Sequence, residues 1–238
     1  MKQIFLKLDW DSDFFNFNVG KITGLIKEKQ DIQNVEFLIE ENKNKLSYYS
    51  TSKELPTFVF ENKKLDIILV DKKTTYSKSI NSDLEINKSI STIDNKTAEE
   101  KLIDLAIQSG IYSRFNVDKK IGKEKFEEMY GLWMINSINH KIAKEVFVFT
   151  ENEDIAGFVT LGEKNNKADI GIIAVDNLFR GKGIGKRLMT SAEKWFSNSG
   201  YKSIQVVTQG DNIPACKLYE SCGYNVESVE LFYHIWKK

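Results

Sequence analysis

The sequence predicts a protein of the α/β (α+β) class with two domains. A smaller α/β domain comes first, and a larger domain follows in which helices flank a mostly antiparallel sheet. Two observations carry this prediction. In the second half of the chain, strand-like segments separated by short polar breaks lie between segments with helical periodicity. A long polar stretch also divides the chain. The 238 residues are 41% hydrophobic, which is enough for one large or two small cores.

Composition excludes several classes of protein. The 34 basic and 34 acidic residues balance, so the chain has no overall attraction for nucleic acid or for an anionic membrane. Its longest apolar runs, such as Ile172–Val175 and Ile67–Val70, are too short to span a bilayer. Residues 1–15 lack the apolar run and cleavage site of a secretory signal, so we expect a cytoplasmic protein.

Metal chemistry is not expected. Cys216 and Cys222 lie in one predicted helix and its end, and the two histidines, His140 and His234, are far from them in sequence. This spacing fits neither a disulfide framework nor a zinc site, so we expect reduced, buried thiols and no metal.

The first domain is expected over residues 1–100. It ends in a polar connector over about 71–100, which has almost no consecutive apolar residues. Before the connector, the β-branched and aromatic runs Val35–Glu40, Thr57–Phe60 and Leu65–Val70 predict short strands.

The second domain is expected over residues 101–238. Apolar residues spaced by three and four predict a helix over Glu124–Ile138. Three strand-like segments follow, with breaks short enough for hairpins, and these predict an antiparallel meander: Val146–Phe149, Ile155–Leu161 and Ala168–Val175.

The remaining elements alternate between helix and strand. A helix with one apolar side begins near Ile184 and ends at the stop signal Asn198-Ser199-Gly200. The strand Ser203–Thr208 and the helix Pro214–Cys222 come next, and two strands, Asn225–Val229 and Leu231–Trp236, close the chain. Self-pairing of these last strands would allow a homodimer.

A glycine-rich turn joins the meander to the helix near Ile184. It reads Arg180-Gly181-Lys182-Gly183-Ile184-Gly185 and is followed by Lys186 and Arg187. The first amides of a helix have no partners within the helix and carry partial positive charge, and glycine lets a ligand approach the backbone. A phosphorylated ligand is therefore one interpretation, and a glycine-rich turn with solvated lysines is the other.

Two familiar phosphate motifs do not fit this turn. A P-loop would need glycine at Arg180 and a hydroxyl residue at Arg187. A dinucleotide-binding fingerprint beginning at Gly181 would need glycine at Lys186. Neither ATP nor NAD is expected here.

The segment ADIGIIAVDNLFRGKGIGKRLM, with SIQVVTQGDN and ACKLYESCGY after it, resembles the GCN5-related N-acetyltransferase (GNAT) family over about 111–238. Arg180, Gly183 and Gly185 match its pyrophosphate loop. The resemblance implies the GNAT fold, with a mixed, mostly antiparallel central sheet, and acetyl-CoA as cosubstrate. It places the pyrophosphate near Gly181, Lys182, Gly183, Gly185 and Lys186, and the pantetheine arm along the main chain of Ile173 and Val175.

The same resemblance suggests roles for further residues. It makes Tyr219 the general acid for the departing thiolate and aims the Asn212 amide at the pantetheine, with Asn225 as a weaker contact. Packing of Tyr219 in the core and capping of a helix by Asn212 are the alternatives. No nucleophilic residue is needed, and Cys216 is expected to be a packing residue. Glu163 and Asp169 are candidate bases, and neither is assigned.

A narrower similarity covers more of the chain. LDWDSDFFNFNVGKI, VDKKTTYSKS, YSRF and TQGDNIPACKLYESCGYNVES look like the dTDP-fucosamine acetyltransferase branch of the family. This similarity implies an acceptor that is a nucleotide-linked amino sugar of the dTDP-4-amino-4,6-dideoxyhexose type. Arg114 could then bind its diphosphate, although an ion pair on the surface is an equal alternative. Acetylation of another amine, such as a protein N-terminus, or binding of acetyl-CoA without turnover remain open.

Overall fold

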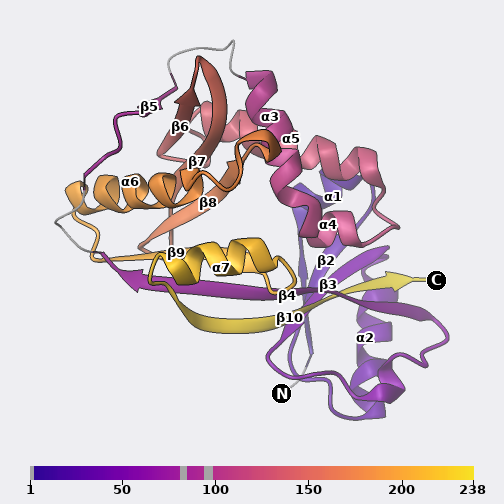
Figure 1. Cartoon of the computed structure of the whole chain (residues 1–238). Helices are drawn as coiled ribbons and strands as arrows, with labels where there is room; N and C mark the ends of the chain where they lie inside the picture. Colours follow the sequence, from indigo (N-terminus) through magenta and orange to yellow (C-terminus); the bar gives the residue numbers. More distant parts are fainter. Residues whose placement is uncertain (1–2, 81–84, 94–98) are drawn as a thin grey trace. The chain divides into compact units, whose positions relative to one another are not determined.

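The computed structural model describes residues 3–80, 85–93 and 99–238 (Figure 1). The chain forms two compact units. Unit 1 contains Met1–Lys73 and Val229–Lys238, and unit 2 contains Thr74–Ser228. None of the described helices is long and apolar enough to cross a membrane.

Unit 1 is a small sheet with two helices. Its elements are β1 (Ile4–Lys7), α1 (Asp9–Phe15), β2 (Val19–Thr23), α2 (Lys29–Glu41), β3 (Leu46–Thr51), the 3-10 turn η1 (Thr57–Val59), the first part of β4 (Leu65–Ser79) and the last part of β10 (Asn225–Lys237). The strand order is β1-β2-β3-β10-β4. β2 and β3 are parallel and joined by α2, whereas β1–β2 and β3–β10 are antiparallel.

Two strand predictions in this unit were wrong. Val35–Glu40 lies inside α2, where the buried residues Ile32, Val35 and Ile39 follow the helical period. A capping box starts this helix: the Glu28 carboxylate accepts the Asp31 N–H, and the Asp31 carboxylate accepts the Glu28 N–H. Thr57–Phe60 forms the 3-10 turn η1 and its end instead of a strand, directly after Pro56.

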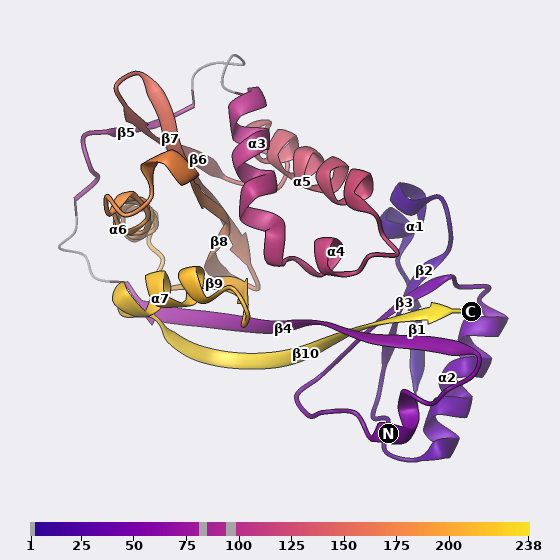
Figure 2. The same ribbon diagram turned by 45° about the vertical axis from the view of Figure 1, so that its right-hand side comes forward.

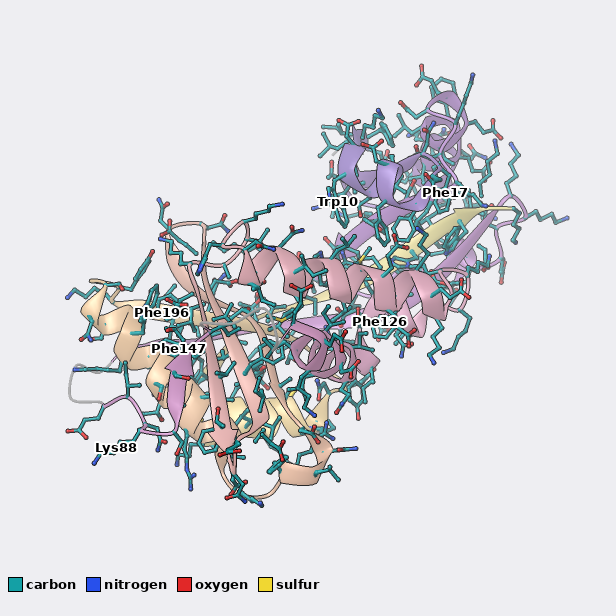
Figure 3. The ribbon with its side chains drawn as sticks, turned by 90° about the horizontal axis from the view of Figure 1, so that it is seen from above. Trp10, Phe17, Lys88, Phe126, Phe147 and Phe196 are labelled. Carbon is teal, nitrogen blue, oxygen red and sulfur yellow. The ribbon has the colours of Figure 1, made fainter. Side chains whose placement is uncertain are left out.

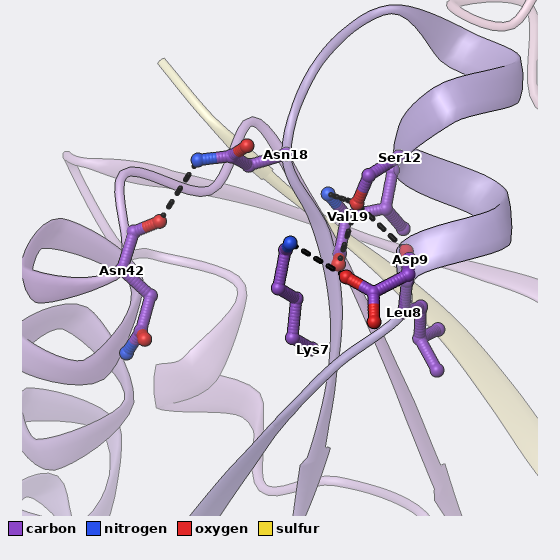
Figure 4. Close-up of polar contacts among 7 residues, drawn as sticks. All are labelled: Lys7, Leu8, Asp9, Ser12, Asn18, Val19 and Asn42. Atoms are coloured by element: carbon purple, nitrogen blue, oxygen red, sulfur yellow. Dashed lines mark hydrogen bonds and ion pairs between the residues drawn. The ribbon is translucent and has the colours of Figure 1, made fainter.

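Local hydrogen bonds connect helix α1 to β2 (Figure 4). The Ser12 hydroxyl donates to the Leu8 carbonyl at 2.7 Å and accepts the Val19 N–H at 2.9 Å. Asp9, in the first turn of α1, pairs with Lys7 of β1 at 2.5 Å. The segment DWDSDFF therefore forms a short, acidic helix that lies on the sheet of unit 1.

Unit 2 carries the remaining elements. They are β5 (Ile90–Thr92), α3 (Glu99–Ser109), the 3-10 turn η3 (Gly110–Tyr112), α4 (Arg114–Val117), α5 (Lys123–Ile138), β6 (Glu145–Glu151), β7 (Asp154–Lys164), β8 (Lys167–Val175), η4 (Asn177–Phe179), α6 (Ile184–Asn198), β9 (Ser203–Gln209) and α7 (Ile213–Ser221). With the second part of β4 and the first part of β10, the strand order is β10-β4-β9-β8-β7-β6-β5. The predicted meander of β6, β7 and β8 is confirmed, and β8 pairs with β9 in parallel.

Helices cover both faces of this sheet. Figure 2 shows α6 on one side of β6–β8 and α3 and α5 on the other. Buried side chains such as Phe147 of β6 and Phe196 of α6 fill the space between sheet and helix (Figure 3). The mixed, mostly antiparallel sheet flanked by helices is the architecture that the resemblance implied.

The predicted polar connector was wrong over its first part. β4 continues to Ser79, because its side chains alternate between buried and exposed although few are apolar. Tyr76 is only 3% exposed. Lys78, which is partly exposed, forms an ion pair with the buried Glu193 of α6 at 2.8 Å. β5 also lies within the predicted connector, and residues 81–84 and 94–98 lie outside the described part of the chain.

The two predicted C-terminal strands are one strand, β10. The break was expected at Glu230, but Glu230 stays within the strand because its carboxylate pairs with Lys73 of β4 at 2.7 Å. Over Leu231–Trp236, β10 lies between β3 and β4 of the same chain. Both edges of β10 are therefore occupied over this stretch, whereas self-pairing with a second chain would need a free edge.

Candidate functional site

The turn between β8 and α6 leaves the start of a 15-residue helix open. Gly183 is the N-cap of α6, with φ 76° and ψ 11°, and Gly181 has φ 80°. Left-handed backbone of this kind favours glycine. A Cβ at either glycine would meet nothing within 4 Å. No side chain caps α6, so the first amides of the helix are available to an anion.

The entrance to this turn is fixed by Asp176. Its carboxylate accepts the Leu178 N–H at 2.9 Å and pairs with Lys101 of α3. The Lys101 ammonium, together with the Leu178 amide, holds the pKa of Asp176 below its usual value. Arg180 then folds back, and its Nε donates to the Val175 carbonyl at 3.1 Å. These contacts set the path of the chain from β8 into the glycine-rich turn.

Strands β8 and β9 separate next to this turn. Their pairs run from Ala168↔Ile204 to Ile170↔Val206, and the chain beyond them lines a cleft. A β-bulge marks the point of separation, where Gly171 and Ile172 of β8 face Thr160 of β7. The Thr160 hydroxyl accepts the Ile172 N–H at 2.8 Å, and a Cβ on Gly171 would approach that hydroxyl to 2.7 Å.

The cleft has a volume of about 770 Å³ and lies entirely within unit 2. Nine of the predicted site residues line it: Ile173, Val175, Arg180, Gly181, Gly183, Gly185, Lys186, Asn212 and Tyr219. They come from β8, the glycine-rich turn, the first turn of α6 and helix α7. Residues as distant in the sequence as Ile173 and Tyr219 thus line one cavity.

Gly185 also has a structural role. A Cβ there would lie 3.1 Å from the Leu218 side chain, so glycine allows α6 and α7 to approach closely. Asn212 likewise combines two roles, because its side chain caps α7 by accepting the Ala215 N–H at 3.3 Å while the residue lines the cleft.

Three predicted site residues are not part of the cleft lining. Lys182 pairs with Glu151 at 2.9 Å and lies over the Phe179 ring. Asn225 is exposed at the start of β10. Arg114 begins α4 and its guanidinium lies 4.4 Å from the centre of the Phe115 ring.

Tyr219 is 3% exposed and lines the cleft from α7. Burial is the main reason that its pKa is raised, with the nearby Cys216 and Cys222 adding to the effect. Its hydroxyl is therefore protonated at neutral pH. The ring packs against Tyr76 of β4 at a centroid distance of 5.6 Å, and the Tyr76 hydroxyl donates to Glu220 at 3.1 Å.

The two candidate bases lie outside the cleft lining. Glu163 pairs with Lys144 at 2.6 Å and also accepts the Tyr201 hydroxyl, and the Lys144 contact lowers its pKa. Asp169 accepts the Gln205 amide at 2.7 Å, and burial raises its pKa. Glu163 thus forms an ion pair with Lys144, and Asp169 forms a hydrogen bond with Gln205 of the neighbouring strand β9.

Sequence reasoning missed part of the lining. Tyr130 and Trp133 were assigned to the buried face of a helix; α5 confirms this for Tyr130, whereas Trp133 is only half-buried, and both line the cleft together with Tyr112. Thr160 and Gly171 of the bulge line it too. Helical periodicity identifies an inward face but does not distinguish a core from a cavity, so the pattern held no signal for these residues.

Comparison with known proteins agrees with this geometry. Residues 100–224, more than half of the chain, match the acetyltransferase (GNAT) family. The spore coat polysaccharide biosynthesis protein SpsD of Bacillus subtilis is 26% identical over 137 residues, covering 58% of this chain and 47% of that protein. The dTDP-fucosamine acetyltransferase of Escherichia coli is 34% identical over 101 residues, 42% of either chain.

A likeness to a solved structure extends over both units. The GCN5-related N-acetyltransferase of Sphaerobacter thermophilus has a TM-score of 0.58 at 13% identity and covers 98% of this chain and 76% of that one. The chain spans less than half the length of the two curated relatives.

Proposed function

Because this chain belongs to the acetyltransferase (GNAT) family, we propose that it transfers an acetyl group from acetyl-CoA to an amine. The observation that carries the proposal is the uncapped start of α6, which opens onto the same cleft as the separated ends of β8 and β9. An anion and an extended polar chain can bind side by side there.

The described residues fit acetyl-CoA. The amides at Gly183 and Gly185 and the charges of Arg180 and Lys186 would hold the pyrophosphate, and the open space over Gly181 and Gly183 leaves it room. Lys182 would add charge from beside the cleft. Because β8 leaves β9 after Ile170, the main chain of Ile173 and Val175 can offer hydrogen bonds to the pantetheine amides. When bound, acetyl-CoA supplies the acetyl group as an activated thioester.

Tyr219 would stabilise the departing sulfur. In the reaction a nitrogen–carbon bond forms and a carbon–sulfur bond breaks, while the nitrogen loses one proton and the sulfur gains one. A phenol with a pKa above 10 stays protonated at neutral pH, but giving its proton fully to a thiolate whose acid has a pKa of about 8.5 is uphill. We therefore assign Tyr219 as a hydrogen-bond donor to the departing sulfur, and the proton that the sulfur gains is the one that the acylated nitrogen loses.

The acceptor we propose is a nucleotide-linked amino sugar of the dTDP-4-amino-4,6-dideoxyhexose type. The likeness to dTDP-fucosamine acetyltransferase and to SpsD supports this class. Arg114 also supports it, since its neighbour Phe115 contacts Trp133 of the cleft lining at a centroid distance of 5.9 Å. A guanidinium at this position can form bidentate hydrogen bonds with a diphosphate.

A panel of acceptors tests the proposal. Release of free coenzyme A is measured with dTDP- and UDP-linked amino sugars, short peptides and simple amines. We expect turnover with amino sugars and none with peptides. Acetylation of peptides alone would reject the amino sugar as the acceptor, and acetyl-CoA binding without release of coenzyme A for any amine would indicate a module without catalytic activity.

A second experiment tests the cofactor site. Gly183→Trp should abolish acetyl-CoA binding, because the indole would fill the open space at the helix start.

A further inference from the structure

Three aromatic side chains of the cleft lining come from neighbouring elements, and the proposed chemistry does not yet use them. Tyr112 comes from η3, and Tyr130 and Trp133 come from α5. We call these three residues the aromatic wall. The Tyr130 and Trp133 rings lie 5.0 Å apart at an angle of 54°.

The wall is held firmly from behind. A Cβ on Gly110 would come within 2.5 Å of the Tyr130 ring, so this ring packs directly against the backbone of η3. Phe126 contacts the same ring at a centroid distance of 5.0 Å. Phe115 meets Trp133 edge to face. These contacts restrain the Tyr130 and Trp133 rings, so these two side chains offer a surface that exists before a ligand arrives.

The two ends of the cleft differ in charge. Its charged lining residues, Arg180 and Lys186, belong to the glycine-rich turn and the start of α6. The lining residues that come from the same part of the chain as the aromatic wall are uncharged, and Gln108, Ser109 and Ser137 among them carry polar groups. An uncharged ring with hydroxyl groups on its rim suits the second end, because ring faces pack on aromatic faces while the rim is hydrogen-bonded.

We infer that the aromatic wall binds the sugar ring that carries the acceptor amine, and that it selects a cyclic acceptor over a flexible chain. This inference rests on the proposed acetyl transfer. The wall lines the same cleft as the bulge residues Gly171 and Ile172 and as Tyr219, so a ring placed on it brings its substituents to the reacting end of the cofactor arm. In a nucleotide sugar the diphosphate separates the sugar ring from the base, so a sugar ring held on the wall leaves the base outside it.

Steady-state kinetics with dTDP-4-amino-4,6-dideoxygalactose tests the wall. Trp133→Leu should raise the KM for the sugar about tenfold or more and leave the Kd for acetyl-CoA unchanged, because only the acceptor loses a stacking partner. Trp195→Leu is the matched control, since Trp195 packs on Phe196 of α6 outside the cleft lining. An unchanged sugar KM in Trp133→Leu would overturn the inference.

A measurement on the unmodified protein covers the case in which Trp133→Leu fails to fold. Saturation-transfer NMR with coenzyme A and the same nucleotide sugar should show stronger transfer to the protons of the sugar ring than to those of the thymine. Stronger transfer to thymine would mean that the wall holds the base, and would overturn the inference while leaving acetyl transfer intact. If the protein acetylates no amine at all, the proposed function fails, and absence of transfer to the sugar would then also refute the wall.

Discussion

Replacing Gly183 by alanine separates the cofactor role of the helix start from its structural role. Gly183 has φ 76°, and a Cβ added to it meets no atom of the protein within 4 Å. The substitution therefore strains the backbone without a steric clash. The new methyl group, however, points into space that we assign to the pyrophosphate.

The two effects have different sizes. Left-handed backbone costs a residue with a Cβ about 1–2 kcal/mol, which for a chain of this length lowers the melting temperature by roughly 2–8 °C. A hydrogen bond to a charged group contributes about 1.5–3 kcal/mol, so losing one amide–phosphate contact should raise the Kd for acetyl-CoA by about 10- to 150-fold.

Gly200→Ala provides the control. Gly200 lies after the other end of α6, has φ 86°, and also has nothing within 4 Å of an added Cβ. Calorimetric melting and isothermal titration with acetyl-CoA should give similar melting temperatures for the two variants but weaker binding only for Gly183→Ala. Equal affinity in both variants would refute the idea that the start of α6 holds the pyrophosphate.

Three further outcomes are expected. Tyr219→Phe should lower kcat with little change in the Kd for acetyl-CoA, as measured by coenzyme A release and titration; an unchanged kcat would remove the hydroxyl from the mechanism. Asp176→Asn should destabilise the protein near neutral pH by about 1.5–3 kcal/mol, because Lys101 loses its charged partner. Since the folded pKa of Asp176 is lowered, this difference in unfolding free energy should be complete above pH ~4 and shrink as the pH falls through the folded pKa; a difference independent of pH would contradict the ion pair. Lys144→Met should leave the stability nearly unchanged, because its pair with Glu163 is half exposed and screened by solvent, and a clear loss of stability in chemical denaturation would contradict this.

Strong periodicity made much of unit 2 predictable. In the meander and in α6, local preference and tertiary packing agree, so the apolar residues alone mark the elements. Unit 1 is different. Val35–Glu40 is rich in strand-forming residues, yet the capping box at Glu28 and Asp31 and the burial of every third or fourth residue make it helical.

The second part of β4 was not predicted, because its sequence is polar and lacks a local strand signal. Its place in the sheet depends on partners distant in sequence, such as Glu193 for Lys78. Such pairs are invisible in a local window. The candidate site shows the same limit: glycines at a helix start are a local signal, whereas Trp133 lines the cleft only because of the tertiary packing of α5 against α3 and β6.

In the described part of the chain, helices α2 and α6 each connect two adjacent parallel strands, and these two helices begin in contrasting ways. At α2 the carboxylates of Glu28 and Asp31 already occupy the positions that a bound anion would take, whereas α6 begins without a side-chain cap. At α2, the chain's own acidic side chains therefore take the place of an external anion. Neutralising that pair would therefore be the way to ask whether unit 1 could be converted into a second anion receptor.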